Sequence, residues 1–307
     1  MRLGLFLLVC AALGACAVAP EDEAGVSDAA LGACSKAQAT SALNLRATPG
    51  PLGSLIKTMP AGTAVDVLEI VEAGEAQGWA RVRAGADEGW AKATYLECAE
   101  ERPVLHAVHV DADVAIDGAV EPAWGAAPPA TFDTDWSGKT TATKTTVRAL
   151  WSEHALYMLF VLEGAGFHVD RSRPISVERD KLYEEDCVEV FLAPDPAQRK
   201  KYYEIELGPY GHWFDLAIDR DRGTSDVRWS SGAQIATHPV PEAKVAIIEV
   251  ALRSPDVVRA LKRGASLPMN MFRMEGKSPR QYLAWSPTKT PRPNFHVPEA
   301  FGTLVLE

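Results

Sequence analysis

A carboxylate interrupts an apolar strand pattern in the segment 187–192, Cys-Val-Glu-Val-Phe-Leu. Alternation with a period of two predicts a β-strand, in which successive side chains point to opposite faces. Glu189 then shares one face with Cys187 and Phe191. Burying a carboxylate between apolar side chains is costly unless it is paired or hydrogen-bonded. We therefore expect another protein group or a polar ligand to contact Glu189.

Two arginines on predicted strands are candidate partners of Glu189. Arg148 lies in the segment 142–150 and Arg273 in the segment 268–275, and both segments have strand-like periodicity. We predict a structural ion pair between Glu189 and Arg148, with Arg273 as the alternative partner. The competing interpretation is that the polar groups of this face bind a ligand.

Length and charge limit the classes of protein to consider. The chain has 307 residues, which suggests about two domains, and its hydrophobic content of 47% is ordinary for a globular protein. The formal net charge of −10 argues against nucleic acid or an anionic membrane surface as the partner of the folded part. Small neutral ligands are compatible with this charge.

The N-terminus has the pattern of an export signal. Met1-Arg2 precedes an apolar run, 3–19, that is too short for a spanning helix. Leu13-Gly-Ala-Cys16 resembles the bacterial lipobox, which implies a signal peptide over residues 1–16 and a lipid anchor on Cys16. The alternative is plain secretion after cleavage that follows Ala17 or Ala19. Residues 17–33 are acidic and unpatterned, which is typical of a flexible tether.

The remaining cysteines have different predicted roles. Cys34 and Cys98 bracket a compact segment, and in an oxidising compartment we predict a disulfide between them. Cys187 lies on the predicted strand, where we interpret it as a small buried hydrophobe rather than a catalytic thiol.

The pattern of residues 34–100 predicts a small all-β domain. Short apolar runs alternate with Pro/Gly turns, a pattern typical of a small barrel. The motifs Leu43-Asn-Leu-Arg-Ala-Thr-Pro49, Trp79-Ala-Arg-Val-Arg83 and Gly89-Trp-Ala-Lys92 make the segment similar to a bacterial SH3 domain. That resemblance implies a module that targets the cell envelope, in some cases by binding peptidoglycan.

Residues 104–307 contain regularly spaced predicted strands, and we expect one antiparallel, jelly-roll-like β-sandwich. The ordered motifs Ile116-Asp-Gly-Ala-Val-Glu-Pro-Ala-Trp124, Glu185-Asp-Cys-Val-Glu-Val-Phe191 and Asn294-Phe-His-Val-Pro-Glu-Ala-Phe-Gly302 resemble carbohydrate-binding module family 9. The resemblance implies recognition of mono- or oligosaccharides, often at chain ends, and a structural calcium ion. Asp111, Asp113 and Asp117 are candidate oxygen ligands for calcium.

Charged and aromatic side chains are the candidates for contacting a sugar. Carboxylates and guanidinium groups suit hydroxyls, which both donate and accept hydrogen bonds, and aromatic faces cover the apolar side of a pyranose ring. The predicted ligand-binding residues are Trp136, Tyr183, Glu185, Asp186, Trp213, Trp229, Arg273 and Trp285. Trp229, which follows a polar loop, is the favoured stacking platform. We expect His296 and Glu299 to hold the final strand by hydrogen bonds.

These features favour a non-catalytic, lipid-anchored, carbohydrate-binding protein of the cell envelope. One alternative is a glycoside hydrolase that uses Glu189 and Glu204. A second is a haem-binding sandwich with ligands among Met269, Met271, Met274 and His296. A third is a decayed binding module that acts as a scaffold.

Overall fold

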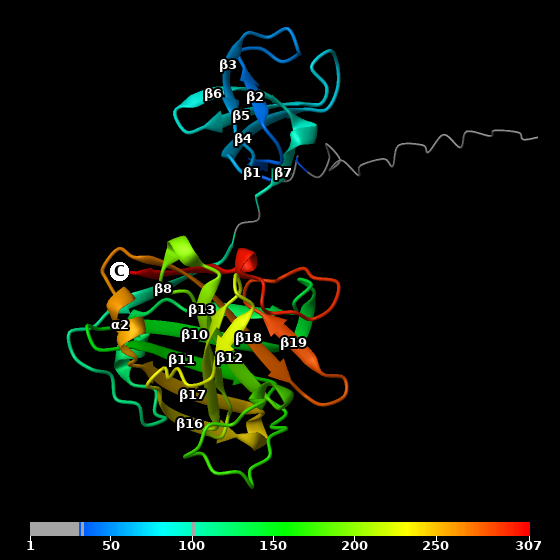
Figure 1. Ribbon diagram of the computed structural model, residues 1–307. Coiled ribbons are helices and arrows are strands. Elements are labelled where there is room, and N and C mark those ends of the chain that lie inside the picture. The colour runs from blue at the N-terminus through cyan, green and yellow to red at the C-terminus, as the bar shows by residue number, and fades with distance from the viewer. Residues whose placement is uncertain (1–30, 32–33, 100–101) are drawn as a thin grey trace, which may run out of the picture. The chain divides into compact units, whose positions relative to one another are not determined.

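A computed structural model of the chain describes residue 31, residues 34–99 and residues 102–307, which form two compact units (Figure 1). Each unit has its own apolar core. The predicted signal peptide, Cys16 and most of the tether lie outside the described residues. Within the described part, no helix is long and apolar enough to cross a membrane.

The first unit is a seven-stranded, antiparallel SH3-like sheet. Its strands are β1 (Lys36–Ala39), β2 (Leu43–Arg46), β3 (Leu55–Met59), β4 (Ala64–Val71), β5 (Trp79–Ala84), β6 (Asp87–Lys92) and β7 (Leu96–Cys98), in the order β3-β2-β6-β5-β4-β1-β7. In β5 the buried Ala80, Val82 and Ala84 alternate with the exposed Arg81 and Arg83. This alternation gives the sheet one apolar face, which folds over the core.

A disulfide closes this unit, as predicted. Cys34 and Cys98 are bonded with a sulfur–sulfur distance of 2.07 Å, across a sequence separation of 64 residues. The bond joins the start of the unit to the end of β7, next to the pairing of β7 with β1.

The second unit contains thirteen strands and one short helix. They are β8 (Val104–His109), β9 (Ala130–Thr134), β10 (Thr140–Trp151), β11 (Leu156–Glu163), β12 (Cys187–Leu192), β13 (Lys201–Leu207), β14 (Trp213–Asp219), β15 (Thr224–Asp226), β16 (Gln234–Val240), β17 (Val245–Leu252), α2 (Pro255–Ala260), β18 (Ser266–Glu275), β19 (Gln281–Ala284) and β20 (Gly302–Leu306). The all-β class predicted from the sequence is confirmed.

The strands pair in the order β15-β14-β13-β12-β18-β20-β8-β10-β11-β17-β16, and this continuous sheet folds into two layers (Figure 1). β12, β13 and β18 belong to one layer, and β10, β11 and β17 to the other. β8 pairs in parallel with both β10 and β20, so the sandwich is mixed at the point where the layers join. Every other strand pair in the described part of this unit is antiparallel.

β12 is buried on both faces. Val188, Val190 and Leu192 point into the main core between the layers. On the other face, Phe191 belongs to an aromatic cluster. Cys187 belongs to a further apolar cluster on that outer face. The outer face is therefore covered by protein, and any polar group on it is shielded from bulk water.

The motif that begins the second unit is tied to β17 by one buried carboxylate. Glu249 has no exposed surface and accepts hydrogen bonds from the backbone amide of Gly118 (2.8 Å) and from the indole nitrogen of Trp124 (2.9 Å). Asp117 contributes its backbone amide at 3.3 Å. One side chain thus satisfies two donors of the loop 117–118 and one of the 3₁₀ turn Pro122–Ala126.

We expect Glu249→Gln to lower the free energy of unfolding of the second unit by about 2–4 kcal/mol, because the amide nitrogen of Gln must face an N–H donor. Urea unfolding followed by tryptophan fluorescence measures the change. Glu242→Gln, an exposed carboxylate at the other end of β17, is the matched control and should change stability by less than about 0.5 kcal/mol. Equal effects of the two substitutions would contradict the anchoring role.

Candidate functional site

A pocket of about 330 Å³ opens on the outer face of β12, β13, β18 and β19. Strand register places its carboxylates on this face, since Glu189 lies directly opposite Phe272 in β18 and Glu206 in β13. The lining residues are Tyr183, Glu189, Glu204, Met274, Tyr282, Pro293, Asn294, Phe295 and His296. An adjoining hollow of about 390 Å³ shares Tyr183, Glu204 and His296 and adds Glu206 and Arg220.

Aromatic rings form the walls of the pocket. Tyr183 lies on the 3₁₀ turn Leu182–Glu184 just before β12 and is 45% exposed. Phe295 stacks on Phe272 with ring centroids 4.0 Å apart and an interplanar angle of 8°. His296 stacks on Phe191, and its Nδ1 lies 2.8 Å from the hydroxyl of Tyr202. Segment 293–297 is thus fixed over the sheet by ring contacts and one hydrogen bond.

Three carboxylates lie at the base of this face. Burial raises the pKa of Glu189 well above its usual value, and the neighbouring carboxyls of Glu204 and Glu206 raise it further. Burial also raises the pKa values of the neighbouring Glu204 and Glu206. In the described part of the chain, no ion pair involves any of these three residues. One carboxyl oxygen of Glu206 is buried without a hydrogen-bond partner.

Arg280 is the cation whose charge favours ionisation of Glu189, but its hydrogen bonds are made elsewhere. Its guanidinium donates to the carbonyls of Gly276 (2.7 Å), Tyr183 (2.6 Å) and Glu185 (2.6 Å). Arg280 therefore positions the turn that carries Tyr183 and leaves the carboxylates without a direct positive partner.

The predicted ion pair between Glu189 and Arg148 is wrong. Arg148 donates to the backbone carbonyls of Ala127 and, at 3.4 Å, Trp124. The alternative partner is also excluded, because Arg273 bonds to Glu275 in the core. Arg273 lies opposite Val188 in the register of β18 with β12. It therefore shares the inner face of β12, on the other side of the sheet from Glu189.

The predicted carboxylates near the start of β12 already have protein partners. Glu185 pairs with the guanidinium of Arg179. Asp186 is buried and accepts from the backbone amides of His168 (2.9 Å) and Gly276 (2.8 Å). Both carboxylates therefore hold loops together and do not line the pocket.

Most of the predicted aromatic platforms lie elsewhere in the fold. Trp213, Trp229 and Trp285 belong to or pack against the main core. Trp229 stacks on Tyr203 with ring centroids 3.9 Å apart and planes 4° apart, and it does not line the pocket. Trp136 packs edge-on against Tyr282, which lines the pocket, but Trp136 does not line it. Of the predicted ligand-binding set, only Tyr183 lines the pocket.

The prediction missed Tyr282, Asn294 and Phe295 as lining residues and underestimated Glu189. The side chain of His296, which we expected to hold the final strand, hydrogen-bonds to β13 through Tyr202. A usable signal was present for Glu204, because strand parity placed it with Glu206 and Tyr202 on one face of β13. Segment 293–297 overlaps a motif of the family resemblance, but the sequence does not place it over the pocket, which it reaches through long-range contacts.

The predicted calcium ligands do not converge. Asp113 accepts a hydrogen bond from Tyr157 (2.7 Å) and pairs with Arg253 (3.2 Å). The side chain of Asp117 instead lies within 4.8 Å of those of Glu121 and Glu249. Both oxygens of Glu249 already accept N–H donors, so this group is a poor fit to an ion that takes six to eight oxygen ligands. Calcium binding stays a prediction without an assigned site.

The geometry gives little support to the glycoside hydrolase and haem-binding alternatives. Glu189 and Glu204, the predicted glycosidase pair, both line the pocket but are only 3% and 5% exposed. Paired glycosidase carboxyls stand roughly 5–9.5 Å apart across a cleft. Met269 and Met271 lie in the main core, so among the methionines considered for haem only Met274 lines the pocket.

Comparison with known families places both units. The family model described as "Carbohydrate family 9 binding domain-like" matches residues 116–307, and the model for the bacterial SH3 domain matches residues 41–97. No curated protein matches the chain.

Solved structures similar to the chain come from bacterial carbohydrate-binding proteins. A proposed carbohydrate-binding protein from Bacteroides uniformis is 17% identical, with a TM-score of 0.54 over 66% of this chain and 99% of its own. A family 9 module from Caldicellulosiruptor kristjanssonii, in complex with cellotriose, is 16% identical, with a TM-score of 0.50 over 67% of this chain and 94% of its own. The glucose complex is 15% identical, with a TM-score of 0.50 over 67% and 96%. At these identities the likeness shows the fold alone.

We expect His296 to make stability depend on pH. Burial lowers its pKa to about 4, from about 6.5 in the unfolded chain. Between these values the unfolded chain binds a proton that the folded protein does not, so stability falls as the pH drops from 6.5 to 4. His296→Gln should remove up to about 3 kcal/mol of this loss, as measured by urea unfolding at several pH values. Exposed His238→Gln is the control. Identical pH profiles for His296→Gln and the unchanged protein would contradict the expectation.

Proposed function

Because the chain belongs to the carbohydrate family 9 binding domain-like family, we propose that its second unit binds a mono- or oligosaccharide without chemical conversion. The observation that supports this proposal is the pocket, with its aromatic walls and its base of buried carboxyl groups. The fold likeness to modules solved with cellotriose and with glucose supports these two sugars as the first ligands to test.

The pocket offers the two kinds of contact that a sugar needs. The exposed ring of Tyr183, with Tyr282 and Phe295 nearby, can cover the apolar CH face of a pyranose. Glu189 and Glu204 can accept from ring hydroxyls, and a carboxyl group that retains its proton can donate to them. The amide of Asn294 adds a donor and an acceptor at the rim.

We further propose that the protein acts at the cell envelope. The lipobox-like motif at Cys16 supports a lipid anchor, with secretion as the alternative, and the SH3 family match supports a targeting module. Peptidoglycan is the partner to test for that module. In this arrangement the first unit localises the protein, and the second unit captures sugar.

Calorimetric titration of glucose and cellotriose into the full chain tests sugar binding. Tyr183→Ala should weaken binding about tenfold, because the loss of a stacked ring costs roughly 1.4 kcal/mol. Glu189→Leu should weaken binding by about tenfold, since it keeps a side chain of similar size but removes the oxygens that can accept from or donate to a sugar hydroxyl.

Trp229→Ala is the matched aromatic control. Because Trp229 stacks on Tyr203 outside the pocket, this substitution should lower the melting temperature and leave sugar affinity within about twofold. Loss of binding with unchanged stability in this variant would place the sugar site elsewhere. The absence of binding by the unchanged protein at millimolar sugar would overturn the proposal for these ligands.

A further inference from the structure

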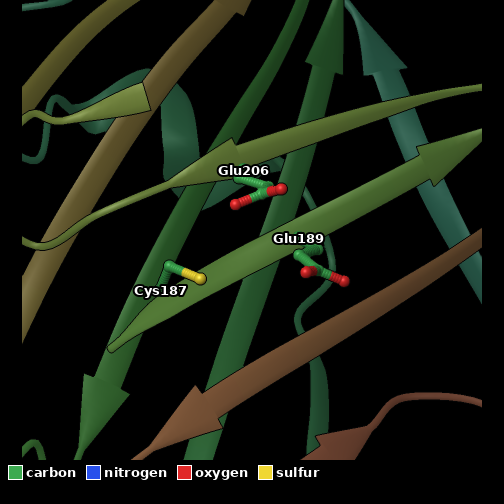
Figure 2. Close-up of side chains that lie close together, drawn as sticks. All are labelled: Cys187, Glu189 and Glu206. Atoms are coloured by element: carbon green, nitrogen blue, oxygen red, sulfur yellow. The ribbon is translucent and has the colours of Figure 1, made fainter. Parts of the chain in front are cut away.

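One thiol and two carboxylates meet on the outer face of β12 and β13. Figure 2 shows Cys187 and Glu189 on one strand and Glu206 on the strand beside it. Their donor atoms all lie within 4.8 Å of one another. The three residues are 1%, 3% and 1% exposed, so the cluster is shielded from bulk water.

The backbone brings these groups together without a loop. Cys187 and Glu189 are two residues apart in β12 and therefore point to the same face. Glu206 is the direct cross-strand neighbour of Glu189. Two paired strands in the centre of a sheet thus fix all three side chains, which is the kind of rigid support that a metal centre requires.

The cluster lacks compensating positive charge. No arginine, lysine or histidine pairs with these carboxylates in the described part of the chain. Arg280 donates its hydrogen bonds to backbone carbonyls. One carboxyl oxygen of Glu206 is buried without a hydrogen-bond partner. Phe214 and Met274 belong to the same buried cluster as Cys187, so the surroundings are apolar. An unpartnered oxygen in such surroundings is expensive.

We propose that Cys187, Glu189 and Glu206 bind a divalent transition-metal ion, with Zn²⁺ as the ion that best fits one thiolate and two carboxylates. Zinc accepts sulfur and oxygen ligands in tetrahedral geometry, at about 2.3 Å and 2.0–2.2 Å from the ion. Calcium and magnesium take only oxygen ligands and more of them. Binding releases to solvent the thiol proton and any proton held by the two carboxyl groups.

The site also has an approach route and a neighbouring carboxylate that can act as a fourth ligand. Glu189 lines the pocket and Glu206 lines the adjoining hollow, so an ion can reach the cluster from either. Glu204, which lines both, can supply the fourth ligand, or a water molecule can do so. This proposal does not depend on sugar binding.

Titration of the full chain with Co²⁺, in the absence of reductant, tests the site. A thiolate ligand gives a sulfur-to-cobalt charge-transfer band in the near ultraviolet, and tetrahedral geometry gives intense visible bands. We expect both, and we expect Zn²⁺ to abolish them by displacement. Failure of Co²⁺ to produce the charge-transfer band would overturn the proposal.

Three variants assign the band to this cluster. Cys187→Ser should abolish it, and a band that survives would belong to another cysteine and contradict the assignment. Glu206→Gln keeps the thiol and should weaken Co²⁺ binding at least about tenfold, a loss typical even of changes outside the ligand set. This variant remains decisive if Cys187→Ser fails to fold. Asp117→Asn, in the other acidic group of the second unit, is the matched control and should leave the titration unchanged.

Discussion

Burial of β12 on both faces is the constraint on which the second unit depends. Its inner face, with Val188 and Val190, completes the core between the layers. Its outer face is covered by aromatic rings apart from one pocket, yet it contains Glu189 and lies beside Glu204 and Glu206. An edge strand could place such carboxylates in water at little cost. In this position they must be protonated, hydrogen-bonded or bound to a ligand.

The cover over this face is held by a few directional interactions. Arg280 binds three backbone carbonyls and so fixes the turn that carries Tyr183. His296 bonds to Tyr202, and Phe295 stacks on Phe272, so segment 293–297 stays over the sheet. The pocket therefore lies between two anchored segments above a rigid sheet. The rings that hold this cover in place also line the pocket.

Fold class could be predicted from the sequence, whereas most of the site could not. Alternation in β5 and β12 and the Pro/Gly turns are local signals, and they led to the correct architecture. The predicted pairing of Glu189 with an arginine was wrong for a physical reason. A sequence shows which residues share a face within one strand, but it does not show how neighbouring strands align. Arg273 lies opposite Val188 and so faces the core. Trp229 lies outside the pocket, and its residue type alone does not reveal that its ring stacks on Tyr203.

The polar groups on the outer face lie at two depths, and a single kind of ligand would not satisfy the groups at both. Glu189 and Glu204 line the pocket, where sugar hydroxyls can reach them. Cys187 lines neither hollow, and the unpartnered oxygen of Glu206 is fully shielded. A neutral sugar hydroxyl between Tyr183 and Phe295 would not neutralise the charge of a carboxylate, whereas a divalent ion bound below it would. Glu189 is the residue that belongs to both depths. An ion there would fix its carboxylate and so preorganise the base of the pocket for a neutral sugar.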